Sequence, residues 1–126
     1  MNVKPSDPCP CGGPSLAECC GPYLSAAELP PTAEATMRSR YSAFVTNNPE
    51  HLFRTWHART RPAGEINTGY GWMGLEILDV VAGTEADQTG VVEFIAKNVH
   101  GDIRERSRFD RRAGRWMYVD AEEPAT

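Results

Sequence analysis

Hydrophobic side chains recur at helical spacing in two stretches that follow one another along the chain. The first stretch carries Met37, Tyr41, Phe44 and Val45, and the second carries Leu52, Phe53 and Trp56. Thr32 precedes the first stretch as a helix N-cap, and Pro49 opens the second at a position that suits a first helical turn. The pattern predicts an amphipathic helix over residues 33–46 and a shorter helix over residues 49–57.

β-Branched and aromatic residues dominate four later stretches, which short polar turns separate. These stretches are residues 73–81, 90–99, 103–109 and 115–119. They predict four antiparallel strands joined by hairpins. Residues 58–71, with a proline and three glycines in a polar setting, predict a loop. Two helices followed by a curved antiparallel sheet indicate an α+β fold, with the helices covering one face of the sheet.

The length and composition fit one domain with a small appendage. The 126 residues are 40% hydrophobic and 24% charged, which is ordinary for a soluble globular protein. No apolar run approaches the ~20 residues that a membrane helix needs, and the N-terminal segment lacks the apolar core of a secretory signal. We therefore expect no membrane contact and a cytoplasmic location, where thiols stay reduced. The net charge of -4 argues against general nucleic-acid binding.

All four cysteines lie close together near the N-terminus. Cys9 and Cys11 form one pair, Cys19 and Cys20 form another, and the turn between them contains two glycines and a proline. Two short thiol pairs brought together by a turn are typical of tetrahedral zinc sites. The glycines allow the backbone to turn its amides toward the sulfurs, which spreads the charge of four thiolates. Because so short a segment cannot bury a core of its own, the metal would supply most of its folding free energy.

Three other uses of the cysteines stay open: a redox-active thiol pair, structural disulfides and an iron–sulfur cluster. A disulfide between the neighbours Cys19 and Cys20 would close a strained ring. Iron–sulfur clusters usually take their ligands from CxxC spacings, which this chain lacks. Zinc is therefore the favoured interpretation. A site closed by four protein sulfurs leaves no open coordination position, so the metal would be structural rather than catalytic.

The third predicted strand carries polar side chains on both of its faces. Alternation places Ile103, Glu105, Ser107 and Phe109 on one face, and Arg104, Arg106 and Arg108 on the other. The apolar ends of the first face indicate that it points inward, so the Glu105 carboxylate needs a partner. Arg38 and Arg40 on the first helix are the candidates, since a guanidinium binds a carboxylate in a bidentate way.

A candidate ligand pocket follows from these residues. It comprises Arg38, Tyr41, His57, Glu105 and Ser107, and it would bind a small anion or perform acid–base chemistry. The alternative is structural: Arg38 and Glu105 form an internal clasp, and His57 ends the second helix near the negative end of its dipole. In that interpretation the core holds Trp56, Trp72 and Trp116. The structural alternative is favoured, because no second acid or activated nucleophile is evident.

Several segments resemble known families. CPCG, the CC pair and CCGPYL, within residues 9–24, resemble the SEC-C metal-binding motif found at the C-terminal tail of the SecA translocation motor. MRSRYSAFV, TWH, the W-x-G-L-E segment, VEFIA, ERSRF and GRWMYVD resemble, in the same order, the YchJ-like family of bacterial proteins, which has no assigned reaction. The resemblance implies that the ligands of a SEC-C zinc site are Cys9, Cys11, Cys19 and Cys20.

The YchJ-like resemblance also implies a cystatin-like fold of the nuclear-transport-factor-two or SnoaL kind. In that fold the sheet curls around the long helix and often leaves a conical pocket. The paired prolines in SAAELPPT read as a connector, which gives a SEC-C zinc-binding motif over residues 1–27 and a cystatin-like domain over residues 28–126. SEC-C motifs often carry lysines between the cysteine pairs, whereas this chain has GGPSLAE, so this loop offers no basic side chain to a partner.

Three functions follow, and the first is favoured. The first is a binding or interaction module, not an enzyme, that contacts a protein partner through the zinc-bound segment with the four cysteines, called the zinc knuckle below. The SecA resemblance implies partners among chaperones or the translation and secretion machinery. The second is a small-molecule binder or enzyme that uses the pocket of the α+β domain. The third is a ribosome or nucleic-acid binder that uses an arginine stripe. The stripe comprises Arg104, Arg106, Arg108, Arg111, Arg112 and Arg115.

Overall fold

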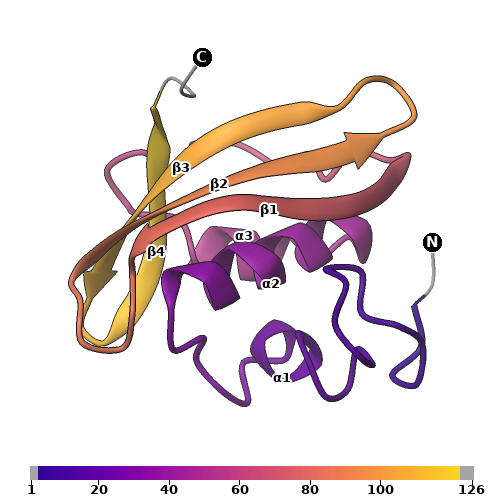
Figure 1. Cartoon of the computed structure of the whole chain (residues 1–126), viewed down its shortest axis with the longest axis horizontal. Helices are drawn as coiled ribbons and strands as arrows, with labels where there is room; N and C mark the ends of the chain where they lie inside the picture. The colour runs from indigo at the N-terminus through magenta and orange to yellow at the C-terminus, as the bar shows by residue number, and fades with distance from the viewer. Residues whose placement is uncertain (1–2, 123–126) are drawn as a thin grey trace.

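A four-stranded antiparallel sheet covers the long helix of the chain (Figure 1). The computed structural model describes residues 3–122. The helices are α1 (Gly21–Leu24), α2 (Ala33–Val45) and α3 (Pro49–Arg54), and the strands are β1 (Trp72–Ala82), β2 (Thr89–Asn98), β3 (Ile103–Arg112) and β4 (Arg115–Glu122). The strands lie in the order β1-β2-β3-β4, each paired with the next along the chain. The predicted α+β fold with hairpin-linked strands is therefore confirmed.

The third helix is shorter than the sequence predicts, because strand β4 takes over its C-terminal residues. The expected helix over 49–57 ends at Arg54. The backbone amide of Tyr118 donates to the carbonyl of Thr55 at 2.7 Å, and the amide of His57 donates to the carbonyl of Tyr118 at 2.8 Å. Trp56 thereby forms an isolated parallel bridge with Tyr118. These bonds satisfy part of the free edge of β4, which would otherwise present unpaired backbone groups.

The curvature of the sheet has local causes in β1. The pairing of β1 with β2 shifts between Trp72 and Gly74 and again between Ile77 and Asp79. Such irregularities bend a strand and increase its twist. At the first of them the amide of Gly74 donates to the hydroxyl of Tyr41 at 2.8 Å, so a side chain from α2 satisfies the backbone where the strand bends. The sheet thereby curls over α2 (Figure 1).

Helix α2 lies between the sheet and the N-terminal segment (Figure 1). Its sheet-facing side includes Met37 and Tyr41, which belong to one core cluster with Val92, Phe94 and Phe109. On its other side it meets the N-terminal segment and α3, and there it buries small polar side chains: Thr36, Ser39 and Ser42. The expected amphipathic helix is thus buried on more than one side. The physical reason is that the cysteine-containing segment covers what would otherwise be the solvent face.

Glycines allow the start of α2 to approach the hairpin between β1 and β2. The amide of Ala33 donates to the carbonyl of Gly83 at 2.9 Å. A Cβ at Gly90 would lie 2.6 Å from the Cα of Gly83 and 3.1 Å from the Cβ of Ala33. No larger residue fits at either glycine without moving the helix away from the sheet.

Candidate metal centre and pocket

The four cysteine sulfurs converge on one point. The Sγ of Cys11 lies 3.6 Å from that of Cys9, 3.5 Å from that of Cys19 and 3.7 Å from that of Cys20, and all four Sγ atoms lie within 4.8 Å of one another. A tetrahedral ion with metal–sulfur bonds of about 2.3 Å spaces its sulfurs about 3.8 Å apart. All four cysteines are free thiols, so none of them forms a disulfide in the structure. The arrangement fits one metal ion held by four thiolates.

A missing side chain makes room for this arrangement. A Cβ at Gly13 would lie 2.4 Å from the Sγ of Cys19 and 3.6 Å from the Cβ of Cys9, so only glycine fits. Gly12 has a φ of +99°, in the region that glycine adopts without strain. Cys20 then serves as the N-cap residue of the short helix α1. The glycines therefore act mainly by leaving space next to the thiols.

The four thiols cannot all be deprotonated at these distances unless a cation binds between them. Hydrogen bonds from Cys11 and Cys20 lower the pKa of the Cys9 thiol far below its ordinary value. Contacts with Cys11 and Cys9 raise the pKa of Cys20, and burial raises the pKa of Cys19 to about 12. Four thiolates at these separations repel one another strongly, and a divalent ion removes the conflict by binding all of them in the deprotonated form.

Arg38 lies beside this cluster rather than in the pocket. Its Nη1 donates to the carbonyl of Cys11 at 2.8 Å, and its Nε donates to Glu34 at 2.9 Å. The expected clasp between Arg38 and Glu105 is wrong. Positions 38 and 40 are about 200° apart around a helix, so the two arginines serve opposite sides of α2. The positive charge of Arg38 lies where it offsets the excess negative charge of a four-thiolate site.

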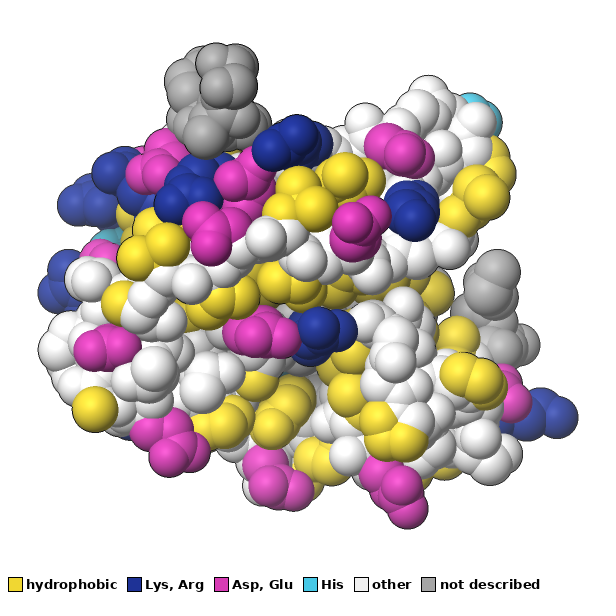
Figure 2. Space-filling model, viewed as in Figure 1, with side chains coloured by type: hydrophobic (Ala, Val, Ile, Leu, Met, Phe, Trp, Pro, Cys, Tyr) yellow, Lys and Arg dark blue, Asp and Glu magenta, His cyan; other side chains and the backbone are white. Residues whose placement is uncertain are grey.

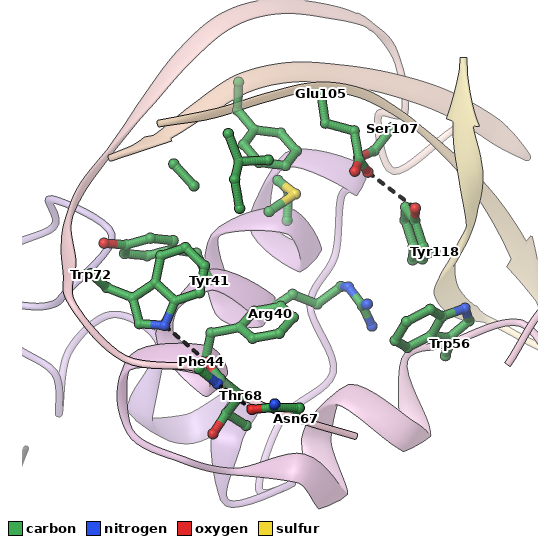
Figure 3. A pocket seen from close by; sticks show the side chains of 15 residues that line it. Arg40, Tyr41, Phe44, Trp56, Asn67, Thr68, Trp72, Glu105, Ser107 and Tyr118 are labelled. Atoms are coloured by element: carbon green, nitrogen blue, oxygen red, sulfur yellow. Dashed lines mark hydrogen bonds between the residues drawn. The ribbon is translucent and has the colours of Figure 1, made fainter. Parts of the chain in front are cut away.

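The pocket lies between α2, the concave face of the sheet and residues 67–69 (Figure 3), and its volume is about 460 Å³. Apolar and aromatic side chains form most of its wall: Met37, Tyr41, Phe44, Trp56, Trp72, Phe94, Ala96, Ile103 and Tyr118. The polar side chains on the wall are Arg40, Asn67, Thr68, Glu105 and Ser107. A mostly apolar cavity of this size with a few polar groups is the usual form of a small-molecule site.

Glu105 accepts hydrogen bonds from two hydroxyl groups at one end of the pocket. Ser107 Oγ lies 2.6 Å and the Tyr118 hydroxyl 3.0 Å from the same oxygen, Oε2. In Figure 3 the dashed line to Tyr118 marks this cluster, at the β3 and β4 side of the cavity. Burial and the nearby carboxylate raise the pKa of Tyr118, so its phenol keeps the proton that it donates. In the described part of the chain, Oε1 of Glu105 accepts no hydrogen bond.

Arg40 extends from α2 into the same end of the pocket (Figure 3) and is only 4% exposed. Its guanidinium carbon lies 4.9 Å from the ring centroid of Trp56 and 4.8 Å from that of Tyr118. Nη1 donates to the carbonyl of Leu52 at 3.1 Å and to Thr55 Oγ1 at 2.8 Å. Burial lowers the pKa of Arg40 to about 10, which still leaves it charged at neutral pH.

Three of the five residues proposed for a pocket line this cavity: Tyr41, Glu105 and Ser107. His57 does not, because the bridge between Trp56 and Tyr118 holds its backbone against β4 and its Nδ1 accepts from the amide of Arg59 at 3.1 Å. The predicted pocket includes Arg38 and leaves out Arg40, although both arginines are candidate partners of Glu105. The signal was present, since position 40 follows Met37 by three residues and precedes Phe44 by four, on the same face of the helix.

The central arginines of the stripe, on the outer face of the sheet, are paired with carboxylates. Arg104 contacts Glu93 at 2.6 Å, and Arg108 contacts Asp120 at 2.6 Å. Arg106 contacts three carboxylates, those of Asp79, Glu93 and Glu122, at 2.7 to 3.0 Å. Figure 2 shows basic and acidic side chains interspersed over the sheet. The central arginines of the stripe therefore present little net positive charge.

The family model described as YchJ, middle NTF2-like domain, matches residues 32–121 of this chain. The chain belongs to the YchJ-like family. A UPF0225 protein of Streptomyces coelicolor is 49% identical over 120 residues, which cover 94% of this chain and 97% of that relative. A UPF0225 protein of Chromobacterium violaceum is 49% identical over 120 residues, which cover 88% of this chain and 89% of the relative.

Two solved structures extend the YchJ-like similarity to the cysteine segment. The solution structure of a SEC-C motif-containing protein from Rhodopseudomonas palustris has a TM-score of 0.79 and 29% identity, and covers 93% of this chain and 98% of that one. The crystal structure of a SEC-C motif-containing protein from Psychrobacter arcticus has a TM-score of 0.68 and 26% identity, and covers 94% of this chain and 84% of that one. The predicted family and the NTF2-like fold with an N-terminal cysteine cluster are confirmed. Among the described residues, no helix has the length and apolar character that a membrane span requires.

Proposed function

We propose that this YchJ-like protein binds a small organic molecule in the pocket under its sheet, and that a structural zinc ion fixes its N-terminal segment. The observation that carries the proposal is a cavity of about 460 Å³ with two charged groups on its wall, the buried Arg40 and the half-buried Glu105. Protein cores are packed to near crystal density, so a cavity of this volume is not a packing defect. Its aromatic wall would bury most of a drug-sized molecule.

Zinc is the metal that best suits the cysteine cluster. Four thiolates at tetrahedral spacing form a soft donor set, which selects zinc over hard cations such as Mg²⁺ and Ca²⁺. All four positions are taken by protein sulfurs, so the metal has no site for a substrate or a reactive water. Its role is therefore to hold residues 9–20 in one conformation against α2. Reduced thiols of this kind suit the cytoplasm, which we propose as the location.

The other two expected functions receive less support from the geometry. A nucleic-acid or ribosome contact needs uncompensated arginines, and four members of the stripe are paired with carboxylates. A protein partner at the knuckle stays a prediction. A pull-down that compares wild type with Cys19→Ser tests it, because a partner that recognises the metal-bound knuckle would be lost together with the metal.

The small-molecule proposal is tested with a compound library and intrinsic tryptophan fluorescence, since Trp56 and Trp72 both line the cavity. Ala96 is 5% exposed and also lines the cavity, so Ala96→Leu fills part of it. Ala58→Leu on the exposed loop is the matched control. We expect at least one compound to bind saturably to wild type and to Ala58→Leu, and more weakly to Ala96→Leu. The proposal fails if no compound binds saturably, or if all binders ignore the Ala96 substitution.

A further inference from the structure

We infer that the pocket ligand has no net charge and carries a hydrogen-bond acceptor beside a hydrogen-bond donor at one end of an apolar body. The acceptor would meet Arg40 and the donor would meet Glu105. This inference rests on the proposed small-molecule function and names the chemistry of the ligand. It follows from which hydrogen-bonding atoms of these two side chains have a partner in the protein and which do not.

Only one nitrogen of the Arg40 guanidinium donates hydrogen bonds to the protein. Both of its hydrogen bonds to the chain leave from Nη1, to Leu52 and Thr55. Within the described residues, Nε and Nη2 donate to no protein acceptor. The rings of Trp56 and Tyr118 lie close to the guanidinium, so a ligand atom meets its edge, where the remaining N–H groups point. These N–H groups are not among the fully buried unpaired atoms of the described residues, so an acceptor in the pocket can reach them and form charge-assisted bonds.

Only one carboxylate oxygen of Glu105 accepts hydrogen bonds from the protein. Ser107 and Tyr118 both donate to Oε2, and no described residue donates to Oε1. None of the ion pairs among the described residues joins Glu105 to Arg40, although both side chains line one cavity. The carboxylate therefore keeps one oxygen for a donor from outside the chain. A ligand group that fits between the two side chains must offer an acceptor to one and a donor to the other.

Charge balance excludes ligands with a single charge at this end. A carboxylate on Arg40 would lie near Glu105, and an ammonium group on Glu105 would lie near Arg40. In a cavity with a mostly apolar wall both repulsions are stronger than in bulk water. Two head groups supply an acceptor and a donor with no net charge: a carboxamide, and the zwitterion of an α-amino acid. They share the same recognition chemistry, and only the zwitterion gives charge-assisted bonds on both sides.

The body of the ligand is apolar because most of the remaining wall is apolar, with Asn67 and Thr68 as the polar side chains away from Arg40 and Glu105. Tyr41 and Phe44 pack against Trp72 with ring centroids 6.1 and 5.7 Å apart, and the hydroxyl of Tyr41 is occupied by Gly74. The indole N–H of Trp72 is likewise occupied, by the carbonyl of Thr68 at 2.9 Å. These aromatic side chains thus present carbon surface to the cavity and no free donor or acceptor of their own.

Four probes with one phenyl body test the inference by calorimetry: 3-phenylpropanamide, L-phenylalanine, 3-phenylpropanoate and 3-phenylpropylamine. We expect the amide or the amino acid to bind at least about tenfold more tightly than either singly charged probe. Glu105→Gln should weaken the neutral binder by about ten- to hundredfold and strengthen 3-phenylpropanoate. Arg40→Lys should also weaken the neutral binder. Glu85→Gln, on the exposed β1–β2 turn, should change nothing, and a thermal melt confirms that each variant is folded.

The outcomes separate this inference from the proposed function. If 3-phenylpropanoate binds most tightly to wild type, the pocket is an anion site and the inference fails. It also fails if none of the four probes binds while a library compound binds to wild type and not to Ala96→Leu; the proposed function then stands. If neither the probes nor the library bind, both fail.

Discussion

The hydroxyl of Ser42, in the last turn of α2, lies 3.7 Å from the sulfur of Cys9. Arg38, one turn earlier on the same helix, donates to the carbonyl of Cys11 at 2.8 Å. The cysteine segment is therefore not a tail attached by a linker. It is packed on the central helix, and Cys9, Cys11 and Cys20 share one core cluster with Met37 and Tyr41.

Loss of one thiolate should release the metal and loosen the segment around it. In Cys19→Ser we expect less than one equivalent of zinc by elemental analysis and faster amide exchange over residues 9–23, because the segment has little core of its own. The remaining domain should stay folded with a lower melting temperature, since one side of α2 loses its cover. Ala17→Ser, at an exposed position of the same loop, should bind a full equivalent. Wild-type protein that is metal-free yet ordered through this segment would contradict the zinc proposal.

Gly13 should be essential for metal affinity although it supplies no ligand. In Gly13→Ala the new Cβ would lie 2.4 Å from the Sγ of Cys19, so the sulfur must leave its position. We expect zinc affinity to fall by at least about tenfold in a competition assay with a chromophoric chelator. Gly64→Ala is the control, because a Cβ at that position would have no neighbouring atom within 4 Å. Equal affinity in the two variants would show that the sulfur has another place to go.

His51 should make the protein sensitive to mild acid. Its ring is 2% exposed, and Nε2 lies 2.8 Å from Ser39 Oγ. Burial, and then the nearby charges of Arg54 and Arg40, lower its pKa from 6.5 to about 4. The unfolded chain therefore binds a proton before the folded chain does, and the free energy of unfolding falls as the pH drops from about 6.5 to about 4. The full loss is about 3 kcal/mol, at 1.36 kcal/mol for each pKa unit.

Urea denaturation at pH 7.5 and at pH 4.5 measures this effect as a difference between wild type and His51→Gln. The difference isolates His51 from the cysteines, which also take up protons when acid releases the metal. We expect wild type to lose more stability than the variant over this interval. The same loss in both proteins would assign the acid sensitivity to other groups.

The arginine stripe should not retain the protein on heparin. Arg106 contacts Asp79, Glu93 and Glu122, and Arg108 contacts Asp120, so phosphate or sulfate groups would have to displace carboxylates. We expect wild type, Arg106→Ala and Arg108→Ala all to elute from heparin in the wash at low salt. Salt-dependent retention of wild type that either substitution removes would instead revive the nucleic-acid hypothesis.

The hydrophobic pattern predicted the elements well where a single periodicity governs them. Helical spacing of Met37, Tyr41 and Phe44 predicted α2, and β-branched runs predicted all four strands. The pattern failed at residues 55–57, where backbone hydrogen bonds to Tyr118 replace those of a helix. Local sequence carries no information on a strand that passes about 60 residues later.

The candidate site divides in the same way. The cysteine cluster was predictable because its ligands are close in sequence and their chemistry is specific. The pocket was only partly predictable, because it depends on which elements meet. Strand alternation brought out Glu105 and Ser107, but the choice between Arg38 and Arg40 depends on what covers each side of α2. The contribution of Thr68 depends on the path of a loop that has no periodicity.

Helix α2 contacts the cysteine segment on one side and the cavity on the other. Its Arg38 and Ser42 touch the cysteine segment, while Arg40 and Tyr41 form part of the wall of the cavity. Purification with strong chelators would therefore loosen the cysteine segment, and through α2 it would disturb the wall of the cavity. A ligand screen on protein purified in this way would understate binding. Conversely, a tight occupant of the cavity should slow the escape of the ion, so dissociation of zinc offers a second way to detect it.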